Sequence, residues 1–364
     1  MKVKIFGAGS IGNHLANASR HFNWDVTICD NDPKALKRTQ FEIYPSRYGS
    51  WDDEIKLMEC NQLNCEDGDL VLIGTPPDSH IAIALKILES GSRPIAIMIE
   101  KPVCPPDLDD VDKLYSLANK LGISLFVGYD HVVSNSTSYA EKFLKTNNIG
   151  VINTLDVEFR EFWGGIFNAH PWLDGPHDSY LGFWKKGGGA SSEHSHAINL
   201  WQHLASSMGF GKIKKVSAHL DFIKSDKVDY DSICAMHFVT ETGFFGRCIQ
   251  DVVTSPPRKW FRVQGSEGFL ECNIKPSNDE IHYSLNQEEA TQQMQKTRPE
   301  DFILELGHIS SVLESNKVNS SPIEISKGFD TMLVVAAAHL SSKTGKQVGI
   351  DYTKGYNRTA LIVD

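Results

Sequence analysis

The first third of the chain alternates short apolar runs with amphipathic stretches, a rhythm typical of β-strands that are each followed by a helix. Continuous apolar runs indicate strands buried on both faces of a parallel sheet. Five such strands are predicted, at Val3–Phe6, Trp24–Asp30, Asp69–Ile73, Ile95–Ile99 and Ile123–Val127. Helices are predicted between them, at Asn13–Arg20, from His80 onward and at Asp107–Leu121. This order favours a doubly wound parallel sheet that is complete near Gly128.

After Gly128 the pattern changes to the alternation of apolar and polar residues that half-buried antiparallel strands show. Strands are predicted at Val151–Phe162, Lys215–Phe222, Ser232–Val239, Gly246–Val253, Trp260–Val263 and Gly268–Asn273. Helices around Asp301–Asn316 and Gly328–Lys343 are expected to cover one face of this sheet. The chain has 364 residues, enough for two domains. We predict an α/β fold with one domain over residues 1–128 and a second, built on a large, mostly antiparallel open sheet, over residues 129–364.

Composition and charge narrow the classes of partner. The formal net charge is -10 and the isoelectric point is near 5.8, which disfavours nucleic acid as a ligand. No apolar run approaches the length of a membrane span, and Gly7 interrupts the apolar start too early for a signal peptide. Seven cysteines without a CxxC pair indicate free thiols in a reducing compartment. These features predict a cytoplasmic protein that binds neither nucleic acid nor membrane.

The hexapeptide Gly-Ala-Gly-Ser-Ile-Gly follows the first predicted strand and has the GxGxxG spacing of a dinucleotide-binding turn. Gly7 permits the tight turn, Gly9 lets a pyrophosphate approach the backbone, and Gly12 lets the helix pack on the strand. The amides at the helix start, at Ser10 and Ile11, attract the phosphates. The first domain is therefore predicted to be a Rossmann domain.

The second strand ends in an acid, Asp30, at about the spacing of a ribose-binding carboxylate. A carboxylate there repels a 2′-phosphate and so favours NAD. Lys34, Lys37 and Arg38 lie just beyond it and would offset part of that repulsion, although a solvated helix face is the plainer interpretation. NAD is thus the predicted cofactor, with NADP left open.

Glu100 and Lys101 follow the fourth predicted strand. A lysine at the carboxyl end of a buried parallel strand lies where open α/β sheets bind their ligands. Thr75 and Pro76 end the preceding strand and would lie against the nicotinamide side of the cofactor. His80 either faces the ligand there or is a structural histidine at a helix start. We expect cofactor contacts from all five residues.

The highest concentration of residues that could act in catalysis follows a run of three glycines, and Ala190–Leu204 in this segment are predicted to form one helix. Glu193, His196 and Asn199 are three residues apart and would share a face of that helix. An acid, a base and an amide in a row suit proton transfer from a sugar hydroxyl, and His196 is the best proton acceptor by residue type. The alternative is a capped helix whose histidines are satisfied in the core.

The same segment offers metal ligands. Glu193, His194 and His196 could bind zinc, and His170 and His177 lie a short way before them. Their spacing lacks the usual zinc pattern, so no metal is predicted.

An aromatic segment rich in turn residues precedes the predicted helix, between His170 and Trp184. Sugars have apolar faces and hydroxyl edges, so Trp172 and Tyr180 are candidate substrate contacts. Packing of a loop or of an oligomer interface is an equally good interpretation.

Together these features resemble the Gfo/Idh/MocA oxidoreductase family, which includes glucose-fructose oxidoreductase and inositol dehydrogenase. The resemblance spans essentially the whole chain. It is carried by the glycine pattern of residues 7–12, by Thr75-Pro76-Pro77 with His80, by Glu100-Lys101-Pro102 and by Gly187–Asn199. It implies a Rossmann domain, a second α/β domain with a large open sheet, and a homo-oligomer, dimer or tetramer, in which that sheet packs against another subunit.

The resemblance also implies roles. The family's catalytic lysine maps to Lys101 and its catalytic histidine to His196. Glu193 and Asn199 stand where the family often has aspartates. Glu193 is expected to orient His196 or to bind a neighbouring hydroxyl, and Asn199 to act by hydrogen bonding alone.

Many relatives carry an arginine shortly after the last Rossmann strand, where this chain has Asp130 and His131, which are expected to contact substrate hydroxyls. The short helix motif, with serine before the histidine, resembles that of members linked to surface-glycan sugars. The predicted activity is hydride transfer between a nicotinamide and a secondary hydroxyl or ketone of a sugar, cyclitol or sugar nucleotide. A redox-neutral NAD-dependent glycosidase and a non-catalytic dinucleotide sensor are the alternatives.

Overall fold

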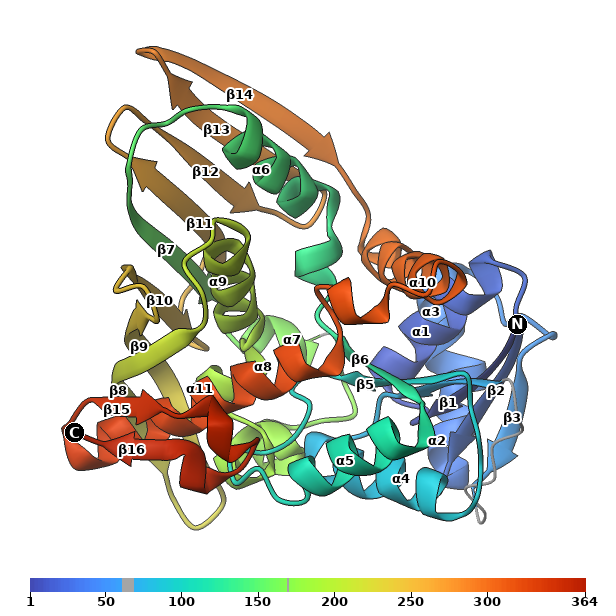
Figure 1. Cartoon of the computed structure of the whole chain (residues 1–364). Helices are drawn as coiled ribbons and strands as arrows, with labels where there is room; N and C mark the ends of the chain where they lie inside the picture. The colour runs from blue at the N-terminus through green and yellow to red at the C-terminus, as the bar shows by residue number, and fades with distance from the viewer. Residues whose placement is uncertain (61–68, 169) are drawn as a thin grey trace.

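A parallel sheet forms the first half of the protein. The computed structural model describes residues 1–60, 69–168 and 170–364 (Figure 1). The strand order β3-β2-β1-β4-β5-β6 is that of a Rossmann fold, which confirms the predicted fold class for this half. The strands are β1 (Lys2–Phe6), β2 (Asp25–Asp30), β3 (Lys56–Glu59), β4 (Asp69–Ile73), β5 (Ala96–Glu100) and β6 (Ser124–Gly128). The helices are α1 (Ser10–His21), α2 (Pro33–Arg38), α3 (Tyr44–Tyr48), α4 (Pro77–Glu89) and α5 (Val111–Leu121).

Burial explains which of these strands the sequence predicts. Every residue of β4 and of β5 is buried, because helices lie on both faces of the sheet, and both strands read as continuous apolar runs. The edge strand β3 has no buried residue and was not among the predicted strands.

A ten-stranded sheet dominates the second half, in the order β14-β13-β12-β11-β7-β10-β9-β8-β15-β16. Only the pairing of β7 with β10 is parallel among its described pairs, which confirms the prediction of a mostly antiparallel sheet. The strands are β7 (Ile152–Arg160), β8 (Ile213–Lys224), β9 (Asp229–Thr240), β10 (Phe245–Asp251), β11 (Arg258–Gly265), β12 (Gly268–Ile274), β13 (Asn278–Leu285), β14 (Glu288–Gln295), β15 (Val348–Ile350) and β16 (Leu361–Val363). The last four, β13 to β16, were not predicted. β14 is polar and almost wholly exposed, and β15 and β16 are very short.

Helices line the side of this sheet that is turned toward the Rossmann sheet (Figure 1). The helices of the second half are α6 (Asn135–Thr146), α7 (Gly164–Asn168), α8 (Ala190–Glu193), α9 (His196–Ser207), α10 (Arg298–Glu314) and α11 (Ile325–Thr344). We expected α10 to cover the second sheet, and this is wrong. It packs on α1 of the Rossmann half, where the Phe302 ring stacks on the His14 ring at 4.7 Å between centroids. The chain thus returns to its first half, and a domain division at residue 128 stays a prediction.

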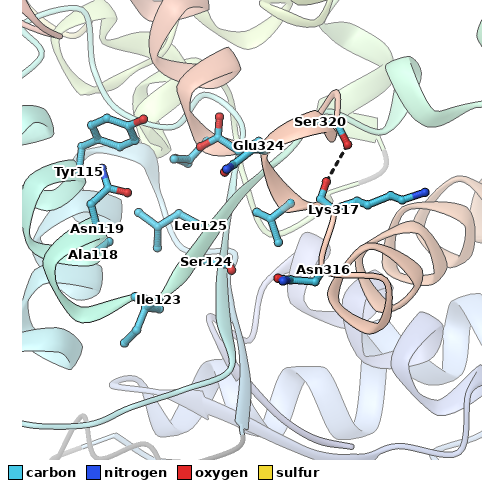
Figure 2. A pocket seen from close by; sticks show the side chains of 14 residues that line it. Tyr115, Ala118, Asn119, Ile123, Ser124, Leu125, Asn316, Lys317, Ser320 and Glu324 are labelled. Atoms are coloured by element: carbon cyan, nitrogen blue, oxygen red, sulfur yellow. Dashed lines mark hydrogen bonds between the residues drawn. The ribbon is translucent and has the colours of Figure 1, made fainter.

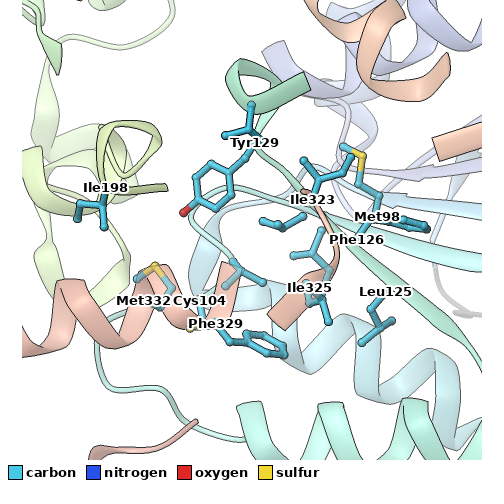
Figure 3. Close-up of a cluster of buried hydrophobic side chains, with 14 of the residues drawn as sticks. Met98, Cys104, Leu125, Phe126, Tyr129, Ile198, Ile323, Ile325, Phe329 and Met332 are labelled. Carbon is cyan, nitrogen blue, oxygen red and sulfur yellow. The ribbon is translucent and has the colours of Figure 1, made fainter. Parts of the chain in front are cut away.

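A buried apolar cluster joins the two halves (Figure 3). Phe126 of β6 and Tyr129 meet Phe329 and Met332 of α11 in it, and Ile198 of α9 lies at its margin. All five side chains are almost completely buried. This cluster fixes α11 and α9 against the carboxyl end of β6, and with them the residues that α9 carries.

In the part of the chain that the structure describes, no helix is both long and apolar enough to cross a membrane. Six cysteines there form no disulfide, and the seventh, Cys65, lies outside the described residues.

Candidate active site

The glycine turn between β1 and α1 has the geometry of a phosphate site. Gly7 has φ +109°, a conformation that favours glycine, and a Cβ on Gly12 would lie 1.9 Å from the Gly7 carbonyl oxygen. A Cβ on Gly9 would meet nothing within 4 Å, so the space beside it is open to a ligand. The helix begins at Ser10, three residues earlier than predicted, which puts Ser10 and Ile11 in its first turn. That turn has no side-chain cap and no acid, so its amides are available to an anion.

Asp30 at the end of β2 supports this turn. One carboxylate oxygen accepts a hydrogen bond from the Ala8 amide at 2.7 Å, and the other accepts from the Asp32 amide at 2.9 Å. A carboxylate oxygen can accept more than one hydrogen bond, so Asp30 retains capacity for ribose hydroxyls. The residues therefore fit a dinucleotide without a 2′-phosphate.

Arg47 is a candidate cofactor residue that the sequence analysis missed. Its guanidinium donates to the Ser10 carbonyl at 2.9 Å and to the Ser10 hydroxyl at 2.7 Å. This holds a cation beside the first turn of α1, where a pyrophosphate would bind. Arg47 lies on α3, in a segment with no recognisable motif, so only the tertiary structure reveals it.

The loop after β4 is held by His80. The His80 ring is fully buried, and its two nitrogens lie 2.7 Å from the Thr75 carbonyl oxygen and 3.1 Å from the Pro102 carbonyl oxygen. Burial lowers the pKa of His80 to about 4, so the ring is neutral and donates to one carbonyl at a time. The expected ligand contact of His80 is thus replaced by a structural role. It ties the loop of Thr75 and Pro76 to the loop after Lys101.

Lys101 lies at the carboxyl end of β5 and is paired with Glu193. Its ammonium donates to a Glu193 carboxylate oxygen at 3.0 Å and to the Glu193 carbonyl at 3.2 Å. The Tyr180 hydroxyl donates to the other carboxylate oxygen at 3.1 Å. Both charged side chains are mostly shielded, at 13% and 14% exposure. Glu193 therefore orients Lys101, and the expectation that it orients His196 is wrong.

The predicted continuous helix is broken, which explains that difference. α8 ends at Glu193 and α9 begins at His196, so Glu193, His196 and Asn199 do not lie in a row. His194, in the break, is buried, and burial lowers its pKa to about 4. The Asn199 amide lies in the core and donates to the Thr331 hydroxyl at 3.2 Å, so the structure does not place it at the site.

Asp130 is the carboxylate beside His196. Its Oδ1 lies 3.5 Å from His196 Nδ1 and 3.9 Å from His131 Nε2, and its Oδ2 lies 3.3 Å from the Arg298 guanidinium. Burial opposes ionisation of Asp130, but the cations Arg298 and Lys101 favour the carboxylate, and its pKa lies below the usual range. Burial lowers the pKa of His196 well below its usual value, so the imidazole is neutral and free to accept a proton.

The His131 ring packs against neighbouring aromatic rings. Its ring stands edge-on to Phe159 and to His196, with centroids 4.9 Å and 4.8 Å apart, and burial lowers its pKa to about 4. One nitrogen each of His131 and His196 and one oxygen of Asp130 lie within 4.8 Å of one another, close enough to share a metal ion. Asp130 and His196 line the same cavity as Lys101, so we interpret the group as a proton-transfer site.

Trp172 lies on the cofactor side of the molecule. Its ring is 5.1 Å from His170 and lies 5.3 Å from the Arg38 guanidinium, which belongs to the helix after Asp30. The structure therefore brings Tyr180 to the Lys101–Glu193 pair but gives Trp172 neighbours near the predicted ribose site.

A small cavity of about 10 Å³ lies at the centre of these groups. Its lining comes from both halves of the chain: Ile11, Glu100, Lys101, Gly128, Asp130, His196, Arg298, Phe302 and Glu305. Burial raises the pKa of Glu100 to about 8. The cavity joins the first turn of α1 to the predicted acid–base residues, which places it at the ligand-binding edge of the Rossmann sheet.

A roomier cavity, of about 360 Å³, lies elsewhere, between α5 and the segment that joins α10 to α11 (Figure 2). Ile123, Ser124 and Leu125 line it at the beginning of β6, whereas the acid–base residues gather where β5 and β6 end. Ligands of open α/β sheets bind at the carboxyl ends of the strands, so we assign the active site to the smaller cavity.

Comparison with known proteins gives a family match for the first part of the chain and the fold of the whole chain. Residues 1–129 match the family model GFO_IDH_MocA, described as "Oxidoreductase family, NAD-binding Rossmann fold". A search of the curated proteins found no match. Among solved structures, the chain resembles aldose-aldose oxidoreductase from Caulobacter crescentus at 16% identity and a TM-score of 0.75, with 96% of this chain and 99% of that chain covered. A levoglucosan dehydrogenase in complex with NADH and L-sorbose gives 16% identity, a TM-score of 0.76 and the same coverage. An oxidoreductase from Agrobacterium radiobacter in complex with NAD+, L-tartaric acid and magnesium gives 16% identity and a TM-score of 0.75, with 96% and 98% covered.

Proposed function

We propose that the protein belongs to the Gfo/Idh/MocA oxidoreductase family, whose NAD-binding Rossmann model matches its first 129 residues, and that it is an NAD-dependent dehydrogenase of a carbohydrate secondary hydroxyl. The substrate class is a sugar, cyclitol or sugar nucleotide, and the reverse reaction reduces the ketone. The observation that carries this proposal is the meeting of Lys101 and His196, from distant parts of the chain, on one cavity beside the first turn of α1.

Each of these side chains has a separate task. Bound NAD supplies the hydride acceptor, and NADH the donor. The Lys101 ammonium, held in place by Glu193, would donate a hydrogen bond to the reacting oxygen and stabilise its developing charge. The neutral His196 imidazole would accept the hydroxyl proton, and the carboxylate of Asp130 would stabilise the imidazolium that forms. Burial raises the pKa of Tyr180 well above its usual value, so its hydroxyl keeps its proton and continues to hold Glu193.

The cofactor residues in this proposal are the glycine turn, Asp30 and Arg47. The carboxylate of Asp30 supports NAD over NADP by repelling a 2′-phosphate. Free thiols fit a cytoplasmic protein. A homo-oligomer is also proposed, and the exposed Phe245 and Ile223 on strands of the second sheet are apolar side chains that a second subunit would cover.

The test follows the absorbance of reduced nicotinamide. Purified protein is mixed with NAD, then with NADP, across free sugars, cyclitols and nucleotide sugars, with Lys101→Met as the blank. We expect turnover that falls by about 10²–10³ in the blank, because a charged donor to the reacting oxygen is lost. Lys212→Met is the matched control, since Lys212 also pairs with a buried carboxylate, Asp330, at 2.8 Å, but lies beyond the end of α9, directly before β8.

The other outcomes separate the alternatives. Release of free sugar from a glycoside without accumulation of reduced nicotinamide would indicate the redox-neutral glycosidase. Binding of cofactor without turnover on the whole panel would indicate a dinucleotide sensor. Equal turnover by wild type and Lys101→Met would remove the mechanism.

A further inference from the structure

Glu305 of α10 is a buried carboxyl group for which the fold shows no use. It is 1% exposed, and within the described part of the chain neither carboxyl oxygen has a hydrogen-bond donor. Phe302, Leu306 and Ile309 are buried on the same helix, so a leucine in place of Glu305 would pack there without the desolvation penalty of a carboxyl group. A polar group retained at such a position indicates a partner that the chain itself does not supply.

Glu305 shares its cavity with a second carboxyl group in the same condition. Glu100 Oε1 also lacks a donor among the described residues, and Oε2 accepts only from the Lys101 amide, at 3.3 Å. A Cβ on Gly128 would lie 2.8 Å from the Glu100 carboxyl carbon, so the glycine leaves room for this carboxyl group. Two buried acids, one from each half of the chain, therefore line the same small space.

The position of this space identifies the kind of ligand that would supply the donors. Ile11 of the first turn of α1 lines it, as do residues at the ends of β5 and β6. A dinucleotide whose pyrophosphate lies on α1 extends across the crevice toward these strand ends. Its nicotinamide riboside offers amide N–H and hydroxyl donors, and the ring carries a positive charge only when it is oxidised.

The cavity of about 10 Å³ has room for only about one water molecule, so side chains must move for the nicotinamide ring to enter. The Arg298 side chain is 53% exposed and has solvent to move into.

We propose that Glu305 is a positioning residue of the nicotinamide site, which accepts hydrogen bonds from the nicotinamide riboside and, together with Glu100, favours oxidised over reduced NAD. This inference rests on the proposed function. It assigns to α10, a helix of the second half, a part in selecting the redox state of a cofactor that the first half binds.

The inference has a pH dependence of defined sign. Burial first, then the charges of Glu100 and Asp130, raise the pKa of Glu305 well above its usual value. A cation brought to the cavity lowers that pKa, so oxidised NAD should release a proton on binding and bind more tightly as pH rises, whereas reduced NAD should not. The titratable and charged groups around Glu305 come from four elements: Glu100 and Lys101 from the end of β5, Asp130 after β6, His196 of α9, and Arg298 and Asp301 of α10. From α1, the ring of His14 stacks on Phe302 of the same helix as Glu305.

The experiment measures binding without turnover. Dissociation constants of NAD+ and NADH are obtained from quenching of tryptophan fluorescence, from about pH 6 to about pH 9, for wild type, Glu305→Gln and Glu305→Leu. Glu314→Gln, an exposed acid at the other end of α10, is the matched control. We expect Glu305→Gln to weaken NAD+ binding about tenfold at the high pH and NADH binding by less than about twofold, with a smaller pH dependence for NAD+.

A purely structural role for Glu305 would give a different result. If the affinities for NAD+ and NADH fall by the same factor, or if neither affinity changes, the inference is overturned. Glu305→Leu provides the test if the glutamine variant is unstable, because a protein with an apolar residue at this buried position should be at least as stable as the wild type. This variant must also lose affinity for NAD+ but not for NADH. Failure of the wild type to bind either nucleotide would instead overturn the proposed function. Normal turnover by the wild type with an unchanged NAD+/NADH ratio in Glu305→Gln would overturn this inference alone.

Discussion

Replacing Asp130 by Asn tests the pairing that the structure assigns to His196. The substitution keeps the shape of the side chain and removes its charge. Asp130 Oδ1 lies 3.5 Å from His196 Nδ1, and the two side chains are 7% and 13% exposed. At this distance, and with an effective dielectric constant of about 20, the gross attraction between the carboxylate and an imidazolium is about 5 kcal/mol.

The expected change in the pH profile follows from this magnitude. A negative charge beside His196 raises its pKa, so the loss of that charge lowers it and makes the imidazole a weaker base. Arg298 already compensates part of the Asp130 charge, so we expect the acidic limb of kcat/KM to move down by about 1 to 2 pH units rather than by the full gross amount. The maximum value of kcat/KM on this profile should fall by about 10²–10³, because the imidazolium that forms in the transition state loses its stabilising partner.

The assay is the pH dependence of steady-state NADH formation, with Glu193→Gln as the comparison. Glu193 pairs with Lys101, so its loss should lower the plateau and leave the acidic limb in place. The assignment of Asp130 is refuted if Asp130→Asn leaves the limb unmoved while Glu193→Gln shifts it. Melting temperatures of both variants show whether a fall in rate reflects loss of the folded protein.

Two further predictions concern the cofactor side. Arg47→Met should weaken the binding of NAD+ and of NADH by the same factor, about tenfold, because both nucleotides contain the pyrophosphate. Isothermal titration calorimetry measures the two affinities, with the exposed Arg93→Met as the control, and unchanged affinity would contradict a phosphate role for Arg47. Gly128→Ala should lower the free energy of unfolding by about 1–3 kcal/mol, because the added Cβ would lie 2.8 Å from the Glu100 carboxyl group. Denaturant titration measures this free energy, and an unchanged value would show that the Glu100 carboxyl group moves away without a penalty.

Patterns within a few residues of one another predicted much of this molecule. The glycine turn, the buried strands and the alternating strands each depend on local periodicity, and the structure contains them. β14 escaped prediction because it is exposed on an edge hairpin and carries no apolar signal. Residues 190–204 appeared as one helix because their composition favours it throughout. The break at His194 and Ser195 is accompanied by tertiary contacts that the sequence does not display, including the hydrogen bonds of Ser191 to Asp231.

The partners of the candidate catalytic residues could not have been predicted in this way. His196 and Asp130 are on different elements, and no spacing rule relates them. Arg298, Phe302 and Glu305 reach the cavity only because α10 leaves the second sheet and packs on α1. A helix that is amphipathic in sequence shows that one face will be buried, but not against which element.

The contacts across the site connect the two halves of the chain by charge as well as by apolar packing. Lys101 after β5 is held by Glu193 of α8, and Asp130 after β6 lies between His196 of α9 and Arg298 of α10. In this arrangement each cation of the site lies beside an acid, so that the buried charges are balanced before any ligand binds. The two remaining acids, Glu100 and Glu305, lack such a partner on their outer oxygens. Burial raises the pKa of both groups, so they are uncharged near neutral pH. A cation that enters the cavity would be balanced when one of them releases its proton, whereas a neutral ligand of the same shape would release none. On the proposed function, this difference would make the assembled site favour oxidised nicotinamide, the form that a dehydrogenase must bind in order to oxidise its substrate.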